Sequence, residues 1–208
     1  MAMSGFLRLC TPSGARFVLA SASSRRLDLL ERIGLIPDAV SPADIDETPK
    51  PHERPDAYAE RVAWEKANTI ADAHPEAFIL AADTVVASAR RILPKADTET
   101  EARKCIGHLS GRRHRIFGAI QLIAPTGESR SRLSTTTVAF KRLTDIEIDT
   151  YIASREWQGK AGGYAIQGRA AIYIRMLSGS HSNVVGLDLY ETYALLTGLG
   201  FRYGESHA

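Results

Sequence analysis

Apolar and polar residues follow two alternating patterns along the chain, one typical of buried strands and one typical of helices. Largely apolar runs bounded by polar or glycine-containing stretches predict strands at residues 17–20, 78–88, 115–124 and 170–177, and a further long strand is predicted at 129–142. The segment 125–128, "PTGE", predicts that two of these strands form a hairpin. Helical spacing predicts helices at residues 25–33, 55–73, 98–111, 144–154 and 190–197. This alternation predicts a mixed α/β fold but does not give the order of the strands.

Three of these helices carry start signals in the sequence. Pro55 suits a first helical turn, where its missing N–H has no intrahelical partner to lose. Thr98 with Glu101, and Thr144 with Glu147, have the spacing of a capping box, in which each side chain bonds the other residue's backbone N–H. We therefore expect helices to begin at these three places.

Length and composition limit the classes of protein that fit. The 208 residues allow one domain, or a two-lobed one, and the net charge of +2 is too small to favour nucleic acid or a membrane as the partner. Cys10 and Cys105 are far apart and lack the spacing of metal ligands, so neither a disulfide framework nor a zinc site is expected. No apolar run approaches the roughly 18 residues of a membrane span. We expect a soluble, cytoplasmic protein.

Two arginines stand where a helix is predicted to begin. Arg25 and Arg26 follow the serine-containing segment "SASS" at residues 21–24. A helix N-terminus carries partial positive charge from its free N–H groups, so two cations are unfavourable there on their own. The pattern suggests that an anion completes the site.

Two further charged residues lie in apolar surroundings. Asp83 interrupts the strand "FILAADTVVA", where an ionised carboxylate is costly unless it is paired or bound to a metal. It is either an aspartate that bonds a turn or, as we prefer, a general base or metal ligand at a cleft. Lys66 falls on the helix face of Val62, Ala63 and Ile70, which should be buried. A lysine there usually extends its ammonium to solvent; otherwise the ammonium points into a cavity that holds negative charge.

Three loops carry weaker candidates. The acidic loop "ADIDET" contains Glu47, and such loops are mostly solvated, although magnesium uses one or two carboxylates together with substrate phosphate. Lys95 lies in "LPKAD", just before a predicted helix. The segment "GKAGGYAIQG" combines four glycines with Lys160 and Gln167. Glycine lets backbone N–H groups approach an oxyanion, and the Gln167 amide could read a base edge or simply bond the backbone.

Other chemistries fit less well. The histidines show no zinc-binding spacing, there is no Gly-x-Ser-x-Gly segment, and Cys105 lies on the apolar side of its helix. Cationic groups, a few carboxylates and a glycine-rich loop fit metal-assisted chemistry on a phosphorylated small molecule.

Six segments of the chain resemble the Maf family of septum-formation-inhibitor-like proteins. They are "LASASSRRLDLLERIGL", "DIDET", "RVAWEKA", "LAADTVV", "LSGRRHRI" and "GKAGGYAIQG…GSHSNVVGLDL", in this order between about residues 17 and 200. The resemblance implies a mixed, twisted sheet flanked by helices around a central cleft, similar to inosine-triphosphate pyrophosphatases. We expect one domain of two lobes over residues 15–202, with a loose segment at 1–14 and a tail at 203–208.

The same resemblance implies an activity and a set of roles. The family members are nucleoside triphosphate pyrophosphatases, which use a divalent metal, here Mg²⁺ or Mn²⁺, and are often homodimers. Asp83 falls on the catalytic position, and Arg25, Glu47, Lys66 and Lys95 fall on active-site positions. We expect Arg25, Lys66 and Lys95 to bind the phosphates, and Asp83 and Glu47 to hold the metal. Arg26, Thr84 and Gln167 match the type that acts on dTTP and UTP.

Two other functions remain as alternatives. One is a pyrophosphatase of different selectivity, for 7-methyl-GTP or for a purine nucleotide such as ITP. The other is a regulator of septum formation that binds nucleotides without hydrolysing them. A panel of triphosphates with detection of pyrophosphate would separate them.

Overall fold

A seven-stranded mixed sheet forms the centre of the molecule in the computed structural model, which describes residues 7–205. The strands lie in the order β10-β8-β7-β4-β2-β3, and β5 pairs with β4. Strand β2 runs parallel to both β3 and β4, whereas the other pairs are antiparallel. This confirms the predicted α/β class. The strands are β2 (Arg16–Ala20), β3 (Ala39–Val40), β4 (Ala77–Ser88), β5 (Arg91–Leu93), β7 (Arg113–Ile123), β8 (Ser129–Phe140) and β10 (Ile174–Ser178).

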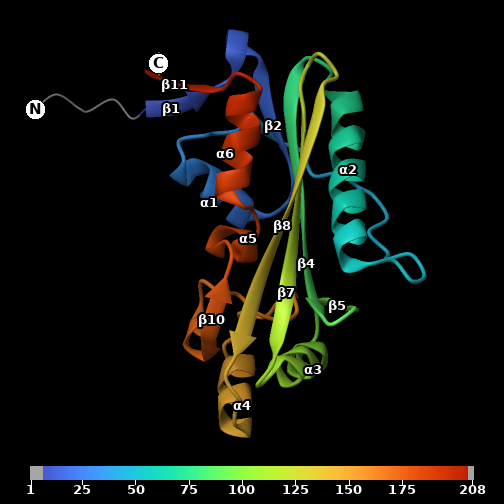
Figure 1. Cartoon of the computed structure of the whole chain (residues 1–208), viewed down its shortest axis with the longest axis vertical. Helices are drawn as coiled ribbons and strands as arrows, with labels where there is room; N and C mark the ends of the chain where they lie inside the picture. Colours follow the sequence, from blue (N-terminus) through green and yellow to red (C-terminus); the bar gives the residue numbers. More distant parts are fainter. Residues whose placement is uncertain (1–6, 206–208) are drawn as a thin grey trace, which may run out of the picture.

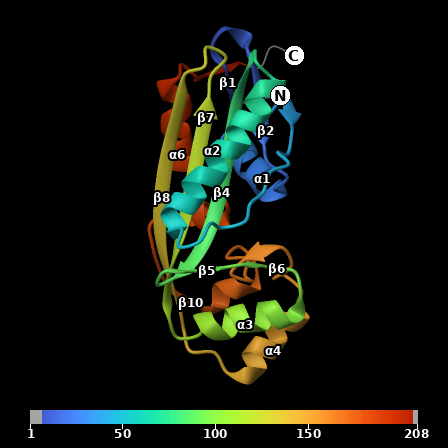
Figure 2. The same ribbon diagram turned by 90° about the vertical axis from the view of Figure 1, so that its right-hand side faces the viewer.

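Helices cover both faces of this sheet (Figure 1). On one face lies α2 (Pro55–Ala73), against β4 and β7. On the other face lie α1 (Ser24–Arg32), α5 (His181–Val185) and α6 (Leu189–Gly198). Figure 2 shows a second group of elements around the far ends of the long strands. This group contains α3 (Glu99–Leu109), α4 (Asp145–Ala153) and the small ribbon of β6 (Lys95–Ala96) and β9 (Lys160–Ala161).

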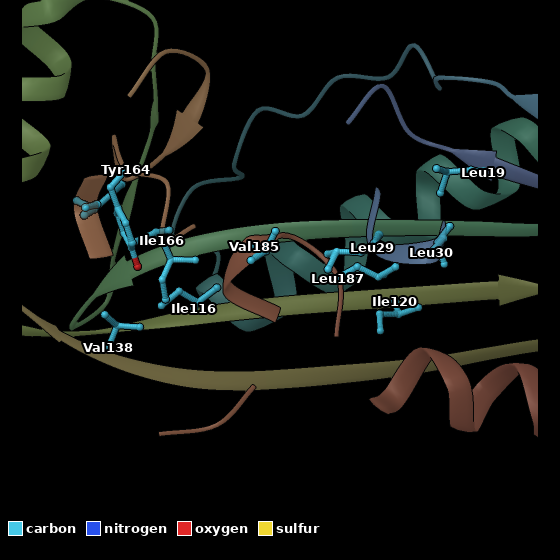
Figure 3. Close-up of a cluster of buried hydrophobic side chains, with 14 of the residues drawn as sticks. Leu19, Leu29, Leu30, Ile116, Ile120, Val138, Tyr164, Ile166, Val185 and Leu187 are labelled. Carbon is cyan, nitrogen blue, oxygen red and sulfur yellow. The ribbon is translucent and has the colours of Figure 1, made fainter. Parts of the chain in front are cut away.

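One cluster of buried apolar side chains connects the two ends of the molecule. It includes Leu19 of β2 with Leu29 and Leu30 of α1, and Tyr164 and Ile166 near the far ends of the long strands (Figure 3). Ile116 and Ile120 of β7 lie beside these two groups, and Val185 and Leu187 lie between them. The long strands therefore act as a common support for both ends.

The sequence predictions hold for most elements. Both capping boxes are formed, from Thr98 with Glu101 at α3 and from Thr144 with Glu147 at α4. The predicted strand at 170–177 is wrong in its first half, because Arg169–Tyr173 forms a 3₁₀ helix and only Ile174–Ser178 is a strand. Residues 170 and 173 are buried and the two between them exposed, which is the period of a 3₁₀ turn and not the alternation of a strand.

The expectation of loose chain ends is wrong for the residues that the structure describes. Strand β1 (Leu7–Cys10) pairs antiparallel with β11 (Arg202–Glu205). Leu9 is 3% exposed and belongs to the main core cluster, which explains why β1 is held in place. The remaining parts of the two expected loose segments, 1–6 and 206–208, lie outside the described residues. None of the helices between residues 7 and 205 is long and apolar enough to cross a bilayer.

Candidate active site

A cavity of about 370 Å³ opens beside the middle of β4. Its lining comes from the end of β2, the start of α1, the acidic loop, α2, β4, the β6–β9 ribbon and α5. All the site residues expected from the sequence line this one cavity: Arg25, Arg26, Glu47, Lys66, Asp83, Thr84, Lys95 and Gln167.

The offset between two parallel strands creates the cavity. Strand β2 ends at Ala20, opposite Ala81, while β4 continues for several more residues. Asp83 and Thr84 therefore follow the point where β2 stops, and they lie on opposite faces of β4 because side chains alternate. A crevice beyond the carboxyl ends of parallel strands is the usual ligand site of open α/β sheets.

A chain of four alternating charges lies on the α2 side of β4. The Lys66 ammonium contacts Asp83 Oδ1 at 2.9 Å and Glu47 Oε1 at 2.8 Å, and Lys95 Nζ contacts Glu47 Oε2 at 2.9 Å. Lys66 and Asp83 are 7% and 6% exposed. The expectation that Lys66 extends to solvent is therefore wrong, since its ammonium pairs with buried negative charge. The reading of Asp83 as a turn-bonding residue is also wrong, because it lies within β4 and pairs with Lys66.

Glu47 is held as a carboxylate by the two lysines. Partial burial would raise its pKa, but hydrogen bonds and charge from Lys66 and Lys95 outweigh burial and lower the pKa to about 2. The loop that carries Glu47 is fixed by α2, where the Tyr58 hydroxyl donates to the Glu47 carbonyl at 2.7 Å. Arg61 on the same helix binds Glu53 through Nε and Nη2, at 2.7 and 2.9 Å. The acidic loop is thus attached to the sheet through α2.

Arg26 is buried on the other face of β4. Its guanidinium donates to the Gly186 carbonyl at 2.9 Å, to Ser21 Oγ at 2.8 Å and to Thr84 Oγ1 at 3.2 Å. Burial lowers the pKa of Arg26, and the negative charge of Asp83 opposes this shift. Three of its donors are therefore committed to the protein, and Thr84 is held in place by the same network.

Arg25 is less constrained than its neighbour. Its Nε donates to the Val185 carbonyl at 3.3 Å, and no carboxylate within residues 7–205 pairs with it. The N-cap residue of α1, Ser23, makes no side-chain cap hydrogen bond. The first turn of α1 thus offers a guanidinium and backbone N–H groups that suit an anion.

Helix α5 and its C-cap residue supply the carbonyl groups that hold both arginines, Val185 for Arg25 and Gly186 for Arg26. None of the site residues expected from the sequence lies in this region. Buried Asn183 anchors α5 to the sheet by donating to Thr136 Oγ1 at 3.0 Å. A Cβ on Gly118 of β7 would lie 1.8 Å from Asn183 Oδ1, so only glycine permits this approach. The segment "GSHSNVVGLDL" resembles the family, but nothing in its sequence distinguishes the two backbone carbonyls that bind the arginines.

The glycine-rich segment forms the remaining wall. Gly162 has φ +66°, and a Cβ there would lie 2.8 Å from Val86 Cγ1, so this turn requires glycine. Tyr164 lines the cavity, and its hydroxyl lies 2.8 Å from Nε2 of buried His114. Burial lowers the pKa of His114 to about 4, and His108 adds to the shift. Gln167 is exposed at the cavity, and no hydrogen bond to another described residue ties its amide to the backbone.

The donor set fits a divalent cation that shares its ligands with a phosphorylated substrate. Among the residues described, no three His, Cys, Asp or Glu side chains gather as a complete metal site. Asp83 and Glu47 nevertheless meet at one cation, the Lys66 ammonium. One or two carboxylates completed by substrate phosphate oxygens are the usual protein environment of Mg²⁺. Asp83 and Glu47 are therefore the residues able to hold such an ion.

Together the fold and the site define an α/β protein with a cleft suited to a polyanion, lined by five cationic and two carboxylate side chains. The chain belongs to the Maf family, since the family model described as "Maf-like protein" matches residues 16–199.

Comparison with individual proteins gives strong matches in sequence. The chain is 59% identical to the dTTP/UTP pyrophosphatase of Rhodospirillum rubrum, covering 94% of this chain and 93% of that protein. It is 56% identical to the dTTP/UTP pyrophosphatase of Caulobacter vibrioides, covering 91% and 98%. A solved HAM1 protein from Coxiella burnetii aligns over 88% of this chain and 98% of its own, with 20% identity and a TM-score of 0.46. At that score the fold assignment rests on the sheet topology described above.

Proposed function

We propose that the protein is a nucleoside triphosphate pyrophosphatase that converts dTTP and UTP to the nucleoside monophosphate and pyrophosphate. The observation that carries this proposal is the single cavity that joins Arg25, Lys66 and Lys95 with Asp83 and Glu47. Its support from sequence is the high identity, over nearly the full length of both chains, to relatives named for that activity.

The cations bind and orient the triphosphate. A nucleoside triphosphate carries several negative charges, and Arg25, Lys66 and Lys95 present fixed positive charge from three different elements. Charge-assisted hydrogen bonds of this kind are about twice as strong as neutral ones. Because pyrophosphate leaves with its charge already neutralised, positioning and electrostatics supply most of the rate enhancement.

Asp83 activates or orients the attacking water. Its carboxylate is held in place by β4 and by Lys66, so it can accept the proton of a water molecule or orient that water toward the α-phosphorus. Asp83 and Glu47 would hold the Mg²⁺ or Mn²⁺ ion. Such an ion, when bound, supplies Lewis-acid polarisation of the phosphate oxygens.

Arg26, Thr84 and Gln167 select the base, and they do so in different ways. The Gln167 amide has both a donor and an acceptor available at the cavity and is suited to read the edge of a pyrimidine. Arg26 is occupied by Ser21, Thr84 and Gly186, so it acts by holding the Thr84 hydroxyl and the α5 backbone in position.

The proposed setting is the cytoplasm, with a nucleotide as the ligand and a second copy of the chain as the partner. A net charge of +2 gives no general attraction to nucleic acid or to an anionic membrane surface. Both cysteines are free, Cys10 exposed and Cys105 buried, which is compatible with a reducing compartment.

A panel of triphosphates with separate detection of pyrophosphate and orthophosphate tests the proposed function. dTTP and UTP should release pyrophosphate and the monophosphate in equal amounts, with Mg²⁺ or Mn²⁺ present. Preference for 7-methyl-GTP or ITP would replace the proposed selectivity with the alternative one. Absence of pyrophosphate from every triphosphate would favour the nucleotide-sensing regulator.

A further inference from the structure

A fifth cation, Lys160, lines the cavity and has no role in the function proposed above. It lies in the glycine-rich segment, half-buried, and donates through Nζ to the Gln158 carbonyl at 3.1 Å. Within residues 7–205 it has no carboxylate partner. Lys66 and Lys95, by contrast, are both paired with carboxylates of the site.

The backbone around Lys160 is fixed. Gly159 N–H donates to the Ala96 carbonyl at 2.9 Å, and Gly162 N–H donates to the Pro94 carbonyl at 3.0 Å. The register of the ribbon sets Lys95 opposite Ala161 and Lys160 opposite Ala96. Because neighbouring residues in a strand alternate, Lys95 and Lys160 lie on opposite faces of the ribbon. Lys95 therefore pairs with Glu47, and Lys160 faces a different part of the cavity.

Arg25 lines the same cavity as Lys160, from the start of α1. Burial lowers the pKa of Lys160, and the positive charge of Arg25 lowers it further. Neither cation has a carboxylate partner among the described residues. Two cations without carboxylate partners in one cavity are unfavourable without an anion, and an anion with two or more charges compensates them best.

We propose that Lys160 and Arg25 form an anion subsite that binds the two phosphates released as pyrophosphate. This inference rests on the proposed function. It divides the cations of the cavity into two groups: Lys66 and Lys95 organise the carboxylates at the reacting phosphate, and Lys160 and Arg25 hold the leaving group.

Equilibrium binding of the two products tests the subsite without turnover. Calorimetry would compare sodium pyrophosphate and dTMP, each at a fixed Mg²⁺ concentration, on the wild type, Lys160→Met and Lys160→Arg. Lys160→Met should weaken pyrophosphate binding about tenfold or more, the usual effect of losing one charged hydrogen bond, and should change dTMP binding less than about twofold. Lys160→Arg should recover most of the loss, because it retains the charge.

Lys104→Met is the matched control, since Lys104 is an exposed lysine of α3 that does not line the cavity. It should bind both products as the wild type does. Unchanged pyrophosphate affinity in Lys160→Met, equal losses for pyrophosphate and dTMP, or a wild type that binds no pyrophosphate would each overturn the subsite. Failure of the proposed function would show separately, as a wild type that releases no pyrophosphate from dTTP or UTP.

Discussion

At the scale of single residues, the site is a set of charges that are costly alone and acceptable together. Lys66 is a buried cation on an apolar helix face, and Asp83 is a buried anion in an apolar strand. Each charge has the other within hydrogen-bond distance. The sequence reveals such residues because a charge in an apolar run stands out. It could not reveal that the carbonyl groups of Val185 and Gly186 hold the two arginines, since backbone acceptors are the same at every position.

Removing the charge of Asp83 should abolish most of the catalysis and leave substrate binding largely intact. We expect Asp83→Asn to lower kcat by about 100- to 10,000-fold, the range typical of losing a general base. Asp72→Asn, which alters an exposed carboxylate of α2, is the control and should keep full activity. Steady-state rates of pyrophosphate release from dTTP give the comparison; undiminished turnover in Asp83→Asn would refute its role.

Truncating Gln167 should affect the choice of base more than the affinity for phosphate. In Gln167→Ala, the ratio of kcat/KM for dTTP to that for a purine triphosphate should fall about tenfold, because one pair of hydrogen bonds to the base is lost. Pyrophosphate inhibition serves as the internal control and should stay the same. An unchanged ratio would mean that Gln167 does not read the base.

At the scale of elements, the close approach of α5 to β7 sets the position of the arginines. Gly118 has no side chain to displace Asn183, and α5 with its C-cap residue Gly186 carries the carbonyls bound by Arg25 and Arg26. Most elements here could be predicted from periodicity and caps, because those signals are local. The 3₁₀ helix Arg169–Tyr173 could not, since a short apolar run fits a strand equally well until its burial is known.

Two glycine substitutions distinguish the effect of the close contact between Gly118 and Asn183 from the general effect of adding a methyl group. Gly118→Ala should lower the free energy of unfolding by about 1–3 kcal/mol, because Asn183 must move, and should raise KM for dTTP. Gly107→Ala lies in the middle of α3, with no atom within 4 Å of the new methyl group. This substitution should raise the free energy of unfolding by about 0.5–1 kcal/mol. Urea unfolding measures both; equal effects of the two changes would contradict the packing argument.

The contact between β7 and the glycine-rich segment should make stability depend on pH through His114. The pKa of His114 falls from its usual 6.5 to about 4 in the fold, so between these values the unfolded chain binds a proton that the folded chain does not. Stability is therefore full above about pH 6.5 and decreases as the pH falls toward 4. This contribution should amount to about 2 kcal/mol between pH 7 and pH 5.

Replacing this histidine should remove that dependence. His114→Gln keeps a polar group near the Tyr164 hydroxyl but cannot titrate, so its unfolding free energy should vary less between pH 7 and pH 5 than that of the wild type. His181→Gln changes an exposed histidine and should leave the wild-type dependence in place. Urea unfolding at pH 7 and pH 5 gives the comparison. The same change in unfolding free energy in the wild type and in His114→Gln would exclude His114 as the cause.

At the scale of the whole molecule, three long strands carry both walls of the cavity. Strands β4, β7 and β8 extend from the α1 and α2 layers to the group around α3 and α4 (Figure 2). These strands could be predicted from the sequence. The resemblance to a family also predicted that eight residues would share one site. It did not predict the pairing of β1 with β11, because two short strands far apart in the chain give no local sign that they meet.

The central claim is that this cavity holds a nucleoside triphosphate with its α-phosphorus at Asp83. A crystal structure with dTTP in which an imido group replaces the oxygen between the α- and β-phosphates tests it most directly. We predict the α-phosphate beside Asp83, the outer phosphates within hydrogen-bond distance of Arg25, and the thymine beside Gln167. A nucleotide bound outside the cavity, or one whose base lies at Arg25 and whose phosphates lie at Gln167, would contradict the account.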